Sequence, residues 1–358
     1  MRGNKIVSLF SGIDAFGVGF NDFDIALHVE VEKHPCAVLE ANKEKYFPGS
    51  TIWNRDIYSV KDEEILQWKD ATGIIGGPMC QAFSPAKGAF DPNDPRVQGI
   101  FEYLRWVRLI QPEFFVMENT AGLAQKNKRF FLDRFIEEAE SLGYEVSTEV
   151  MNSHHYGNAQ NRLRLIAVGV RRDCDWRFSF PSPIPEENRI YAGSIFREDE
   201  HDEPCMPFSE RRQFLISLVP EGGNWRDVDE VYQREILGAN FEKREGGMTG
   251  ILRRVHRLKP LPTLVTSPVQ RNTMLGHFFE NRPLNLNEYK RGQGLPEDFI
   301  LNGPLGAMYK AVGNAVPVQL ARAINNAIVE SRASTSHLKQ PLINLQFEIE
   351  DNGQLTLF

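Results

Sequence analysis

The chain has 358 residues, of which 41% are hydrophobic and 25% charged, and a formal net charge of −7 at pH 7. This balance is ordinary for a globular protein and argues against one that coats nucleic acid without sequence preference, although it leaves room for a local basic face. No run reaches the ~18 apolar residues of a membrane span, and the first residues lack a secretory signal. The four cysteines show no zinc-ligand spacing. We therefore expect a reduced, cytoplasmic protein.

The first half of the chain alternates short β-rich runs with helical patterns. Strands are expected at Lys5–Phe10, Ile25–Glu30, Thr72–Gly76, Phe114–Glu118 and Leu163–Val170, and helices at Gly99–Ile110 and Lys128–Leu142. This alternation predicts an α/β fold with a doubly wound, mostly parallel sheet and helices on both faces. Ligands of such sheets bind outside the carboxyl ends of the strands.

The composition and periodicity of the sequence change near residue 173, where prolines and acidic residues cluster and the helical periodicity is lost. Regular patterning returns at Met308–Ile328, which suggests a helix after the turn Val-Gly-Asn-Ala-Val-Pro. The predicted division is a larger domain at 1–174 and 306–330, a second, irregular domain at 175–305, and a tail at 331–358.

The first expected strand runs into a turn of small residues, Ser11–Gly19. Small residues let a backbone approach a ligand at a helix amino terminus, although such turns also serve NAD, FAD or plain packing. Glu30, at the end of the second strand, suits ribose hydroxyls, and Asp56 suits an adenine amino group. Taken singly, each carboxylate is better explained as a solvated surface group.

Residues 76–84 read Gly-Gly-Pro-Met-Cys-Gln-Ala-Phe-Ser, so Cys80 lies in a tight, glycine-rich turn directly after a short apolar run. A thiol at the carboxyl end of a buried strand is placed for nucleophilic attack rather than for packing. We therefore predict that Cys80 is a nucleophile.

Glu118 closes the apolar run Phe-Phe-Val-Met. Partial burial raises the pKa of a carboxylate, which suits a group that must hold and deliver a proton near neutrality. The alternative is a carboxylate that caps the next helix, beside Asn119 and Thr120.

Arg162 and Arg164 lie in the segment Gln-Asn-Arg-Leu-Arg, where strand alternation would send both to one face. Two guanidinium groups on one face are costly unless they meet anions such as phosphates or carboxylates. A surface ladder of salt bridges is the alternative. Another basic cluster, which is either a binding face or a solvated surface, comprises Arg253, Arg254, His256, Arg257 and Lys259.

Together and in this order, these segments resemble the cytosine-C5 DNA methyltransferases over nearly all of residues 5–328. The matching blocks are Phe-Ser-Gly at 10–12, Gly-Gly-Pro-x-Cys-Gln at 76–81, Asp-Pro-Arg at 94–96, Glu-Asn at 118–119, Gln-x-Arg-x-Arg at 160–164, the run from Arg257 to Thr266 ending in Pro-Thr-Leu-Val-Thr, Arg282-Pro-Leu, Glu288-Tyr289, Gln293-Gly294, and Gly-Asn-Ala-Val-Pro at 313–317. Each block alone is modestly specific, but their collinear order leaves little room for coincidence.

The resemblance implies a Rossmann-like, S-adenosylmethionine-dependent DNA (cytosine-5-)-methyltransferase of the restriction-modification kind, which flips a cytosine out of duplex DNA. It implies that Cys80 attacks cytosine C6, that Glu118 protonates or hydrogen-bonds N3, and that Arg162 and Arg164 steady the flipped nucleotide. Methyl transfer to C5, loss of the C5 proton and elimination of Cys80 would then restore the aromatic ring.

By the same resemblance, 82–98 would be a loop that closes over the flipped base, and 175–305 would contain the target-recognition region. The donor would contact Phe10, Gly12, Ile13, Glu30, Val31, Asp56, Ile57, Pro78, Asn314 and Ala315. DNA contacts are expected at Gln81, Ser84, Lys87, Arg96, Arg254, Arg257 and Thr266. No metal is expected.

Three positions depart from the family pattern. Met79 precedes the nucleophile where proline is usual, which would loosen the turn or add an N–H near the base. Thr120 stands where valine usually follows Glu-Asn, a nearly isosteric change, and Ala159 stands where proline commonly precedes the glutamine. These departures bear on rate and base choice more than on reaction class.

The tail differs in character from the rest of the chain, and its first residues, Ser331–Ser336, suggest a linker. The terminal Gln354, Leu355, Thr356, Leu357 and Phe358 resemble the short peptide that docks into the bacterial sliding clamp, with glutamine as a polar anchor and the last two residues in a hydrophobic pocket. The alternative is structural, because Asn352-Gly353 between apolar runs favours a type I′ hairpin over Ile343–Phe358.

Other functions stay open at this point. One is methylation of RNA on the same scaffold, and another is a catalytically weakened, sequence-specific DNA-binding protein, which Met79 suggests. A nicotinamide-dependent oxidoreductase would give Cys80 no role and fits none of the later blocks. Our expectation is a monomer that acts on double-stranded DNA without membrane contact.

Overall fold

Within the described residues, the central sheet has seven strands in the order β3-β2-β1-β4-β5-β7-β6. The computed structural model describes residues 3–78, 98–200, 203–238, 241–242, 250–336, 347–349 and 355–357. The strands are β1 (Lys5–Leu9), β2 (Asp24–Glu30), β3 (Thr51–Asn54), β4 (Gly73–Gly76), β5 (Phe114–Thr120), β6 (Tyr144–Asn152) and β7 (Leu163–Arg171). Neighbours pair in parallel, except that β7 runs antiparallel to both β5 and β6. The mostly parallel sheet predicted from sequence is confirmed.

Helices cover both faces of this sheet. The α-helices of the described residues, not all of which pack on the sheet, are α1 (Ala15–Gly19), α2 (Lys33–Tyr46), α3 (Asp62–Ile65), α4 (Gly99–Ile110), α5 (Arg129–Ser141), α6 (Glu210–Ser217), α7 (Glu230–Leu237), α8 (Leu286–Gly292), α9 (Leu305–Asn314) and α10 (Val318–Ser336). None of the helices described is long and apolar enough to cross a membrane. Because both faces are covered, a central strand such as β5 is apolar on each side until it reaches Glu118.

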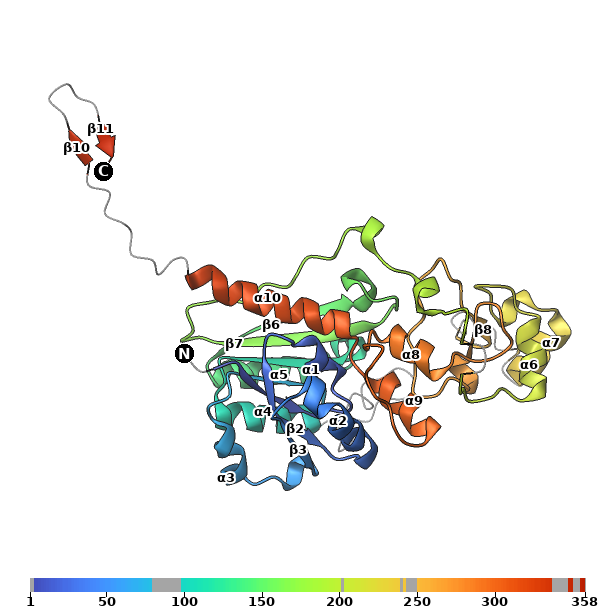
Figure 1. Cartoon of the computed structure of the whole chain (residues 1–358), viewed down its shortest axis with the longest axis horizontal. Coiled ribbons are helices and arrows are strands. Elements are labelled where there is room, and N and C mark those ends of the chain that lie inside the picture. Colours follow the sequence, from blue (N-terminus) through green and yellow to red (C-terminus); the bar gives the residue numbers. More distant parts are fainter. Residues whose placement is uncertain are drawn as a thin grey trace.

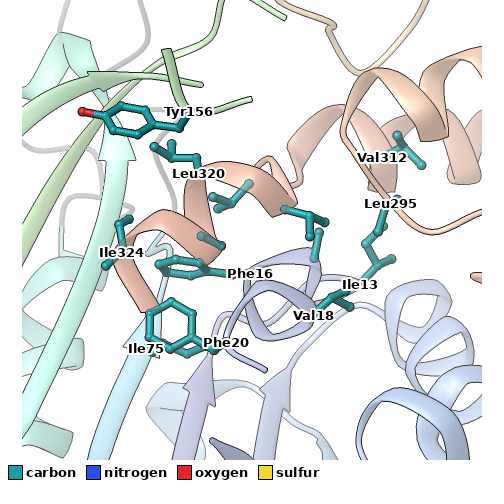
Figure 2. Close-up of a cluster of buried hydrophobic side chains, with 14 of the residues drawn as sticks. Ile13, Phe16, Val18, Phe20, Ile75, Tyr156, Leu295, Val312, Leu320 and Ile324 are labelled. Carbon is teal, nitrogen blue, oxygen red and sulfur yellow. The ribbon is translucent and has the colours of Figure 1, made fainter. Parts of the chain in front are cut away.

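Strand alternation divides the core into two layers. Val116 and Ile166 lie in a cluster with α1 and α10, whereas Met117 and Leu165 lie in a second cluster with α4 and α5. Figure 2 shows the first cluster, in which Phe16 of α1 points toward the side chains of α10. Figure 1 shows α10 lying lengthwise along the sheet.

A third hydrophobic cluster forms within the segment predicted as a second domain. Its members fall between Phe208 and Met274 and include residues of α6 and α7, which Figure 1 shows at the far end of the molecule from the sheet. Leu261, Leu284 and Tyr289 belong instead to the cluster that contains α1 and α10. Packing therefore continues across the predicted boundary at 305, and the division into domains stays a prediction.

The tail requires one correction. Ser331–Ser336 is the last part of α10 rather than a linker, and Arg332 fixes this end of the helix through an ion pair of 3.2 Å with Glu113. Beyond it, β10 (Phe347–Ile349) and β11 (Leu355–Leu357) pair antiparallel as a separate two-stranded sheet. This pairing agrees with the predicted hairpin. Gln354 and Phe358 lie outside the described residues.

Candidate functional site

Most of the predicted site residues follow the carboxyl ends of parallel strands. Because β1, β2, β3, β4 and β5 run in one direction, their carboxyl ends meet at one edge of the sheet. Of the residues predicted to contact the donor, Glu30 ends β2, Pro78 follows β4, and the others up to Ile57 follow β1, β2 or β3, whereas Asn314 and Ala315 lie at the junction of α9 and α10. Glu118 lies near the end of β5. The residues predicted to contact the donor, called the donor half below, therefore lie on the same edge of the sheet as Glu118 and its neighbours, called the reaction half.

The turn after β1 has an unusual backbone. Phe10, Gly12 and Asp14 all adopt left-handed conformations, with φ of 52°, 56° and 49°. Such values are rare for residues other than glycine and are held only where the surroundings impose them. Ile13 is buried in the first cluster, and Asp14 Oδ1 accepts a hydrogen bond of 2.8 Å from the Gly17 N–H. These two anchors fix the turn.

Glu30 is tied to the same turn. Its Oε2 accepts a hydrogen bond of 2.8 Å from the Gly12 N–H, and its Oε1 accepts one of 2.7 Å from the Glu32 N–H. Burial raises the pKa of Glu30 above its ordinary value, against the effect of these two N–H donors. The carboxylate is thus oriented at the turn before any ligand arrives.

A buried pair beneath this turn was missed from sequence. His28 Nδ1 lies 3.1 Å from Asp14 Oδ2, and both side chains are buried. His28 and Glu30 are two residues apart on β2, so both point to the face that carries the turn. Nothing in the sequence marked either partner, because the pairing joins two segments through the fold alone.

Two more residues that were predicted to contact the donor, Asp56 and Ile57, follow the end of β3. Asp56 Oδ1 accepts a hydrogen bond of 3.1 Å from the Tyr58 N–H at the start of η1 (Ile57–Ser59), and its side chain is exposed. Ile57 is buried and Val31 is 58% exposed. Asp56 therefore presents an oriented carboxylate beside an apolar surface.

Asn314 and Ala315 lie at the junction of α9 and α10. Asn314 is exposed and Ala315 is half-buried. A Cβ at the neighbouring Gly313 would lie 2.4 Å from the Val265 carbonyl oxygen, so only glycine allows this close packing. The junction is thereby held against the backbone next to Thr266.

The reaction half centres on Glu118 and Arg164. Arg164 Nε lies 2.6 Å from Glu118 Oε1, with 12% and 10% of the two side chains exposed. Burial raises the pKa of Glu118, and the nearby guanidinium groups of Arg164 and Arg162 lower it in part. The carboxyl group is therefore inclined to hold a proton, and it does not act as a helix cap.

Arg162 corrects the expectation that strand alternation sends both arginines to one face. It precedes β7, so strand alternation does not apply to it, and its side chain is buried. Its Nη1 and Nη2 donate to the carbonyls of Leu264 and Gly313 at 2.8 and 2.7 Å. Arg162 thus ties the reaction half to the Asn314 junction through the backbone, and a direct contact between Arg162 and the nucleotide stays a prediction.

The buried side-chain amides of Gln160 and Gln293 extend this connection between the reaction half and the junction of α9 and α10. Gln160 Nε2 donates to Gln293 Oε1 at 2.9 Å, and Gln160 Oε1 accepts from the Leu264 N–H at 2.9 Å. Gln293 Nε2 in turn donates to the Val312 carbonyl at 2.7 Å. Both glutamines appear in the matching sequence blocks, but their positioning role required the fold to be seen.

The turn after β4 runs against Glu118. A Cβ at Gly77 would lie 2.9 Å from Glu118 Oε2, and the Asn119 side chain donates a hydrogen bond of 3.1 Å to the Pro78 carbonyl. From sequence, Asn119 was named only as part of the Glu-Asn block and as a neighbour of Glu118, so this bond to the turn was not predicted. The described turn ends at Pro78; Met79, Cys80, Gln81, Ser84, Lys87 and Arg96 lie outside the described residues.

Arg254 is a second correction. Its side chain is buried and donates to four backbone carbonyls and to Asn281 Oδ1, at 2.6 to 2.9 Å. The guanidinium is fully engaged inside the protein, so the expectation that it contacts DNA is wrong. Arg257 and Thr266 are exposed, and Arg257 lies over the Phe278 ring at 5.2 Å.

No cluster of three or more possible metal ligands occurs in the part of the chain that the structure describes.

The Glu118–Arg164 pair predicts a pH-dependent loss of stability. Replacement of the guanidinium, Arg164→Met, removes the charge that lowers the pKa of Glu118, so this pKa rises further. A carboxyl whose pKa is higher in the folded than in the unfolded state contributes stability below its unfolded pKa, which is lost as the pH rises through the folded pKa. We expect a loss of about 3–5 kcal/mol in the free energy of unfolding near pH ~8, as for broken buried pairs, and a smaller loss near pH ~5.

Urea unfolding at both pH values measures this difference. The double variant Glu118→Gln with Arg164→Met is the control, because it carries no ionisable carboxyl at this position and should lose the additional pH dependence. An equal loss at both pH values in Arg164→Met would contradict the assignment.

Comparison of the sequence with known proteins assigns this chain to a family. A sequence model of the C-5 cytosine-specific DNA methylases matches residues 4–330. The Type II methyltransferase M.PspPI of Psychrobacter sp. is 34% identical over 337 residues, which cover 92% of this chain and 79% of that protein. The Type II methyltransferase M.Eco47II of Escherichia coli is 30% identical over 334 residues, which cover 90% and 78% of the two chains.

Solved structures show the same fold. A putative DNA modification methyltransferase encoded within an E. coli prophage superposes with a TM-score of 0.66 at 21% identity, over 92% of this chain and 99% of that one. A mutant of Spodoptera frugiperda DNMT2 superposes with a TM-score of 0.58 at 17% identity, over 91% and 100%. The fold, the family and the enzyme class predicted from sequence are confirmed: this chain belongs to the C-5 cytosine-specific DNA methylase family.

Proposed function

We propose that the protein transfers a methyl group from S-adenosylmethionine to C5 of a cytosine that it flips out of a specific duplex sequence. The observation that carries this proposal is the buried Glu118–Arg164 pair next to the turn that leads toward Cys80. The Type II methyltransferases to which the chain is similar support DNA as the substrate. We also propose that the protein is cytoplasmic and monomeric. Size-exclusion chromatography with light scattering measures its mass in solution and so tests whether it is a monomer.

The donor half fits S-adenosylmethionine. A Cβ at Gly12 would meet no atom within 4 Å, so this part of the turn borders open space. Glu30 would accept hydrogen bonds from ribose hydroxyls, and Asp56 would accept one from the adenine amino group, with Val31 and Ile57 as apolar neighbours. When bound, this donor would supply the electrophilic methyl group.

The reaction half would prepare the cytosine. Glu118 Oε1 is held by Arg164, whereas Oε2 is directed at Gly77 and therefore at the turn before Cys80. We assign Oε2 as the atom that shares a proton with cytosine N3, which draws electron density from the ring and favours attack of the Cys80 thiolate on C6. Arg164 would also reach O2 of the base, while Arg162 supports the site from beneath.

The flipped base requires contacts to the duplex as well. Arg257 and Thr266 are exposed and are retained as proposed DNA contacts. Gln81, Ser84, Lys87 and Arg96 stay proposals that rest on the sequence. The segment 175–305 is proposed to read the target, because loops of irregular structure can follow base edges in the major groove.

Bisulfite sequencing of DNA from cells that express this chain tests the function directly. We expect 5-methylcytosine at one short sequence with the intact chain and none with Cys80→Ser, because the hydroxyl is a far weaker nucleophile than a thiolate. With S-adenosylmethionine present, purified protein should also form a stable covalent adduct with a duplex that carries 5-fluorocytosine at that position, because fluorine at C5 cannot leave as a proton and the Cys80 thiolate is then not eliminated. An adduct in the Cys80→Ser variant, or methylation at the normal rate, would contradict the role of Cys80.

The same experiment separates the alternatives. Methylation of RNA but not of DNA would favour an RNA substrate, and binding of duplex DNA without any adduct would favour a non-catalytic binding protein.

The contact between Gly77 and Glu118 gives a second test. In Gly77→Ala the new methyl group would press on Glu118 Oε2, so we expect the methyl-transfer rate to fall by about a hundredfold, as for displaced catalytic groups. Gly306→Ala is the matched control, since a Cβ there meets no atom within 4 Å. Thermal unfolding of both variants excludes global loss of structure, and a normal rate in Gly77→Ala would show that this carboxyl oxygen is not required.

The chain end is proposed to bind a bacterial sliding clamp through Gln354, Leu355, Leu357 and Phe358. The hairpin between β10 and β11 favours the structural alternative, so truncation decides between them. A pull-down with purified clamp should lose this protein when the last five residues are removed. Equal retention of the truncated chain on the clamp would contradict the proposal that the chain end binds it.

A further inference from the structure

Thr120 lies beside the catalytic pair and has no role in the mechanism so far. It ends β5 two residues beyond Glu118, and strand alternation sends both side chains to one face. In the antiparallel ladder Thr120 is the residue directly opposite Arg164. Side chains in such opposite positions are close neighbours. Glu118, Arg164 and Thr120 therefore border the same part of the site.

The hydroxyl of Thr120 is buried and has no hydrogen-bond partner in the part of the chain that the structure describes. The backbone N–H of Thr120 is engaged elsewhere, because it donates a hydrogen bond of 2.9 Å to Asn119 Oδ1. Thr120 also occupies the N-cap position of η5 (Ala121–Ala124), where a threonine hydroxyl often bonds the helix backbone, but it makes no such bond. The Thr120 hydroxyl therefore has no hydrogen-bond partner among the described residues.

An unpartnered buried hydroxyl destabilises the folded protein, and valine would fill the same volume without that penalty. Such a group in a native structure requires an explanation. Ser50 has a similar unpartnered hydroxyl, but it precedes β3 and so lies at the opposite edge of the sheet. Thr120 differs because its position is next to the groups that hold the substrate.

We propose that the Thr120 hydroxyl is a further substrate-contacting group, which obtains its hydrogen-bond partner from the flipped nucleotide that Glu118 and Arg164 hold. This inference rests on the proposed function and names one more residue of the same site. The free protein then keeps an unsatisfied group that becomes satisfied only when the nucleotide enters. One consequence is that removal of the hydroxyl should change stability and activity in opposite directions.

The test compares Thr120→Val, which removes the hydroxyl at nearly constant shape, with Thr120→Ser, which keeps it. Ser50→Ala is the matched control for loss of an unpartnered hydroxyl away from the site. For each full-length protein we would measure the thermal midpoint, the affinity for S-adenosylmethionine, and the single-turnover rate on a duplex that carries the target found by bisulfite sequencing.

We expect Thr120→Val to raise the thermal midpoint, to leave donor affinity unchanged, and to lower the single-turnover rate by about tenfold, the effect of one lost hydrogen bond. Thr120→Ser should recover most of the rate, and Ser50→Ala should lose none. A rate within about twofold of the intact chain in Thr120→Val would overturn the inference, since one hydrogen bond contributes more. A lower thermal midpoint in Thr120→Val would also overturn it, because the hydroxyl would then have a partner within the free protein.

The intact chain, run in parallel, separates this inference from the function on which it rests. If the intact chain transfers no methyl group to any DNA, the proposed function fails and the inference fails with it. If the intact chain is active and the Thr120→Val variant equals it, only the role of Thr120 is lost.

Discussion

The ion pair between Glu118 and Arg164 joins the two strands on which the candidate reaction site is built. The pair is possible because β7 inserts antiparallel beside β5, which brings residues far apart in sequence into diagonal contact at the carboxyl edge of the sheet. Its burial has two consequences. It inclines the carboxyl group toward the protonated form, and it requires the guanidinium to stay in place, because an isolated buried charge would be costly.

The surroundings of this pair are organised to hold it rigidly. Arg162 binds the carbonyls of Leu264 and Gly313, and the buried amides of Gln160 and Gln293 continue the connection to the junction of α9 and α10. The donor half is fixed in a similar way from the other side, by Glu30 and Asp14. Buried polar groups that bond to several segments in this way favour one arrangement of the chain, so donor and nucleotide would meet groups that need little rearrangement.

Much of this architecture could be predicted from the sequence. The alternation of apolar runs gave five strands close to their observed bounds, and α4 begins and ends where its periodicity predicted. β3 and β6 were missed because β3 is short and β6 is an edge strand with few buried residues, so neither has a strong apolar pattern. The collinear motifs then gave Glu118 and Arg164 their place at one site, which periodicity alone could not do.

What the sequence could not provide was the environment of individual polar groups. From sequence, Arg254 was predicted to contact DNA and Arg162 to contact the flipped nucleotide. Both side chains are buried and bonded to backbone carbonyls supplied by distant segments. The Asp14–His28 pair and the bond from Asn119 to Pro78 have the same origin. Such contacts depend on how loops cross one another, and no local pattern records that crossing.

The central claim is that Glu118, held by Arg164, and Cys80 act on the same cytosine ring. An experimental structure of the protein trapped covalently on a 5-fluorocytosine duplex tests this claim most directly. The account predicts that Cys80 Sγ is bonded to C6 and that the Glu118 carboxyl group lies within hydrogen-bonding distance of N3 of the same ring. A trapped ring whose N3 faces other groups, with Glu118 bonded to Arg164 alone, would contradict it.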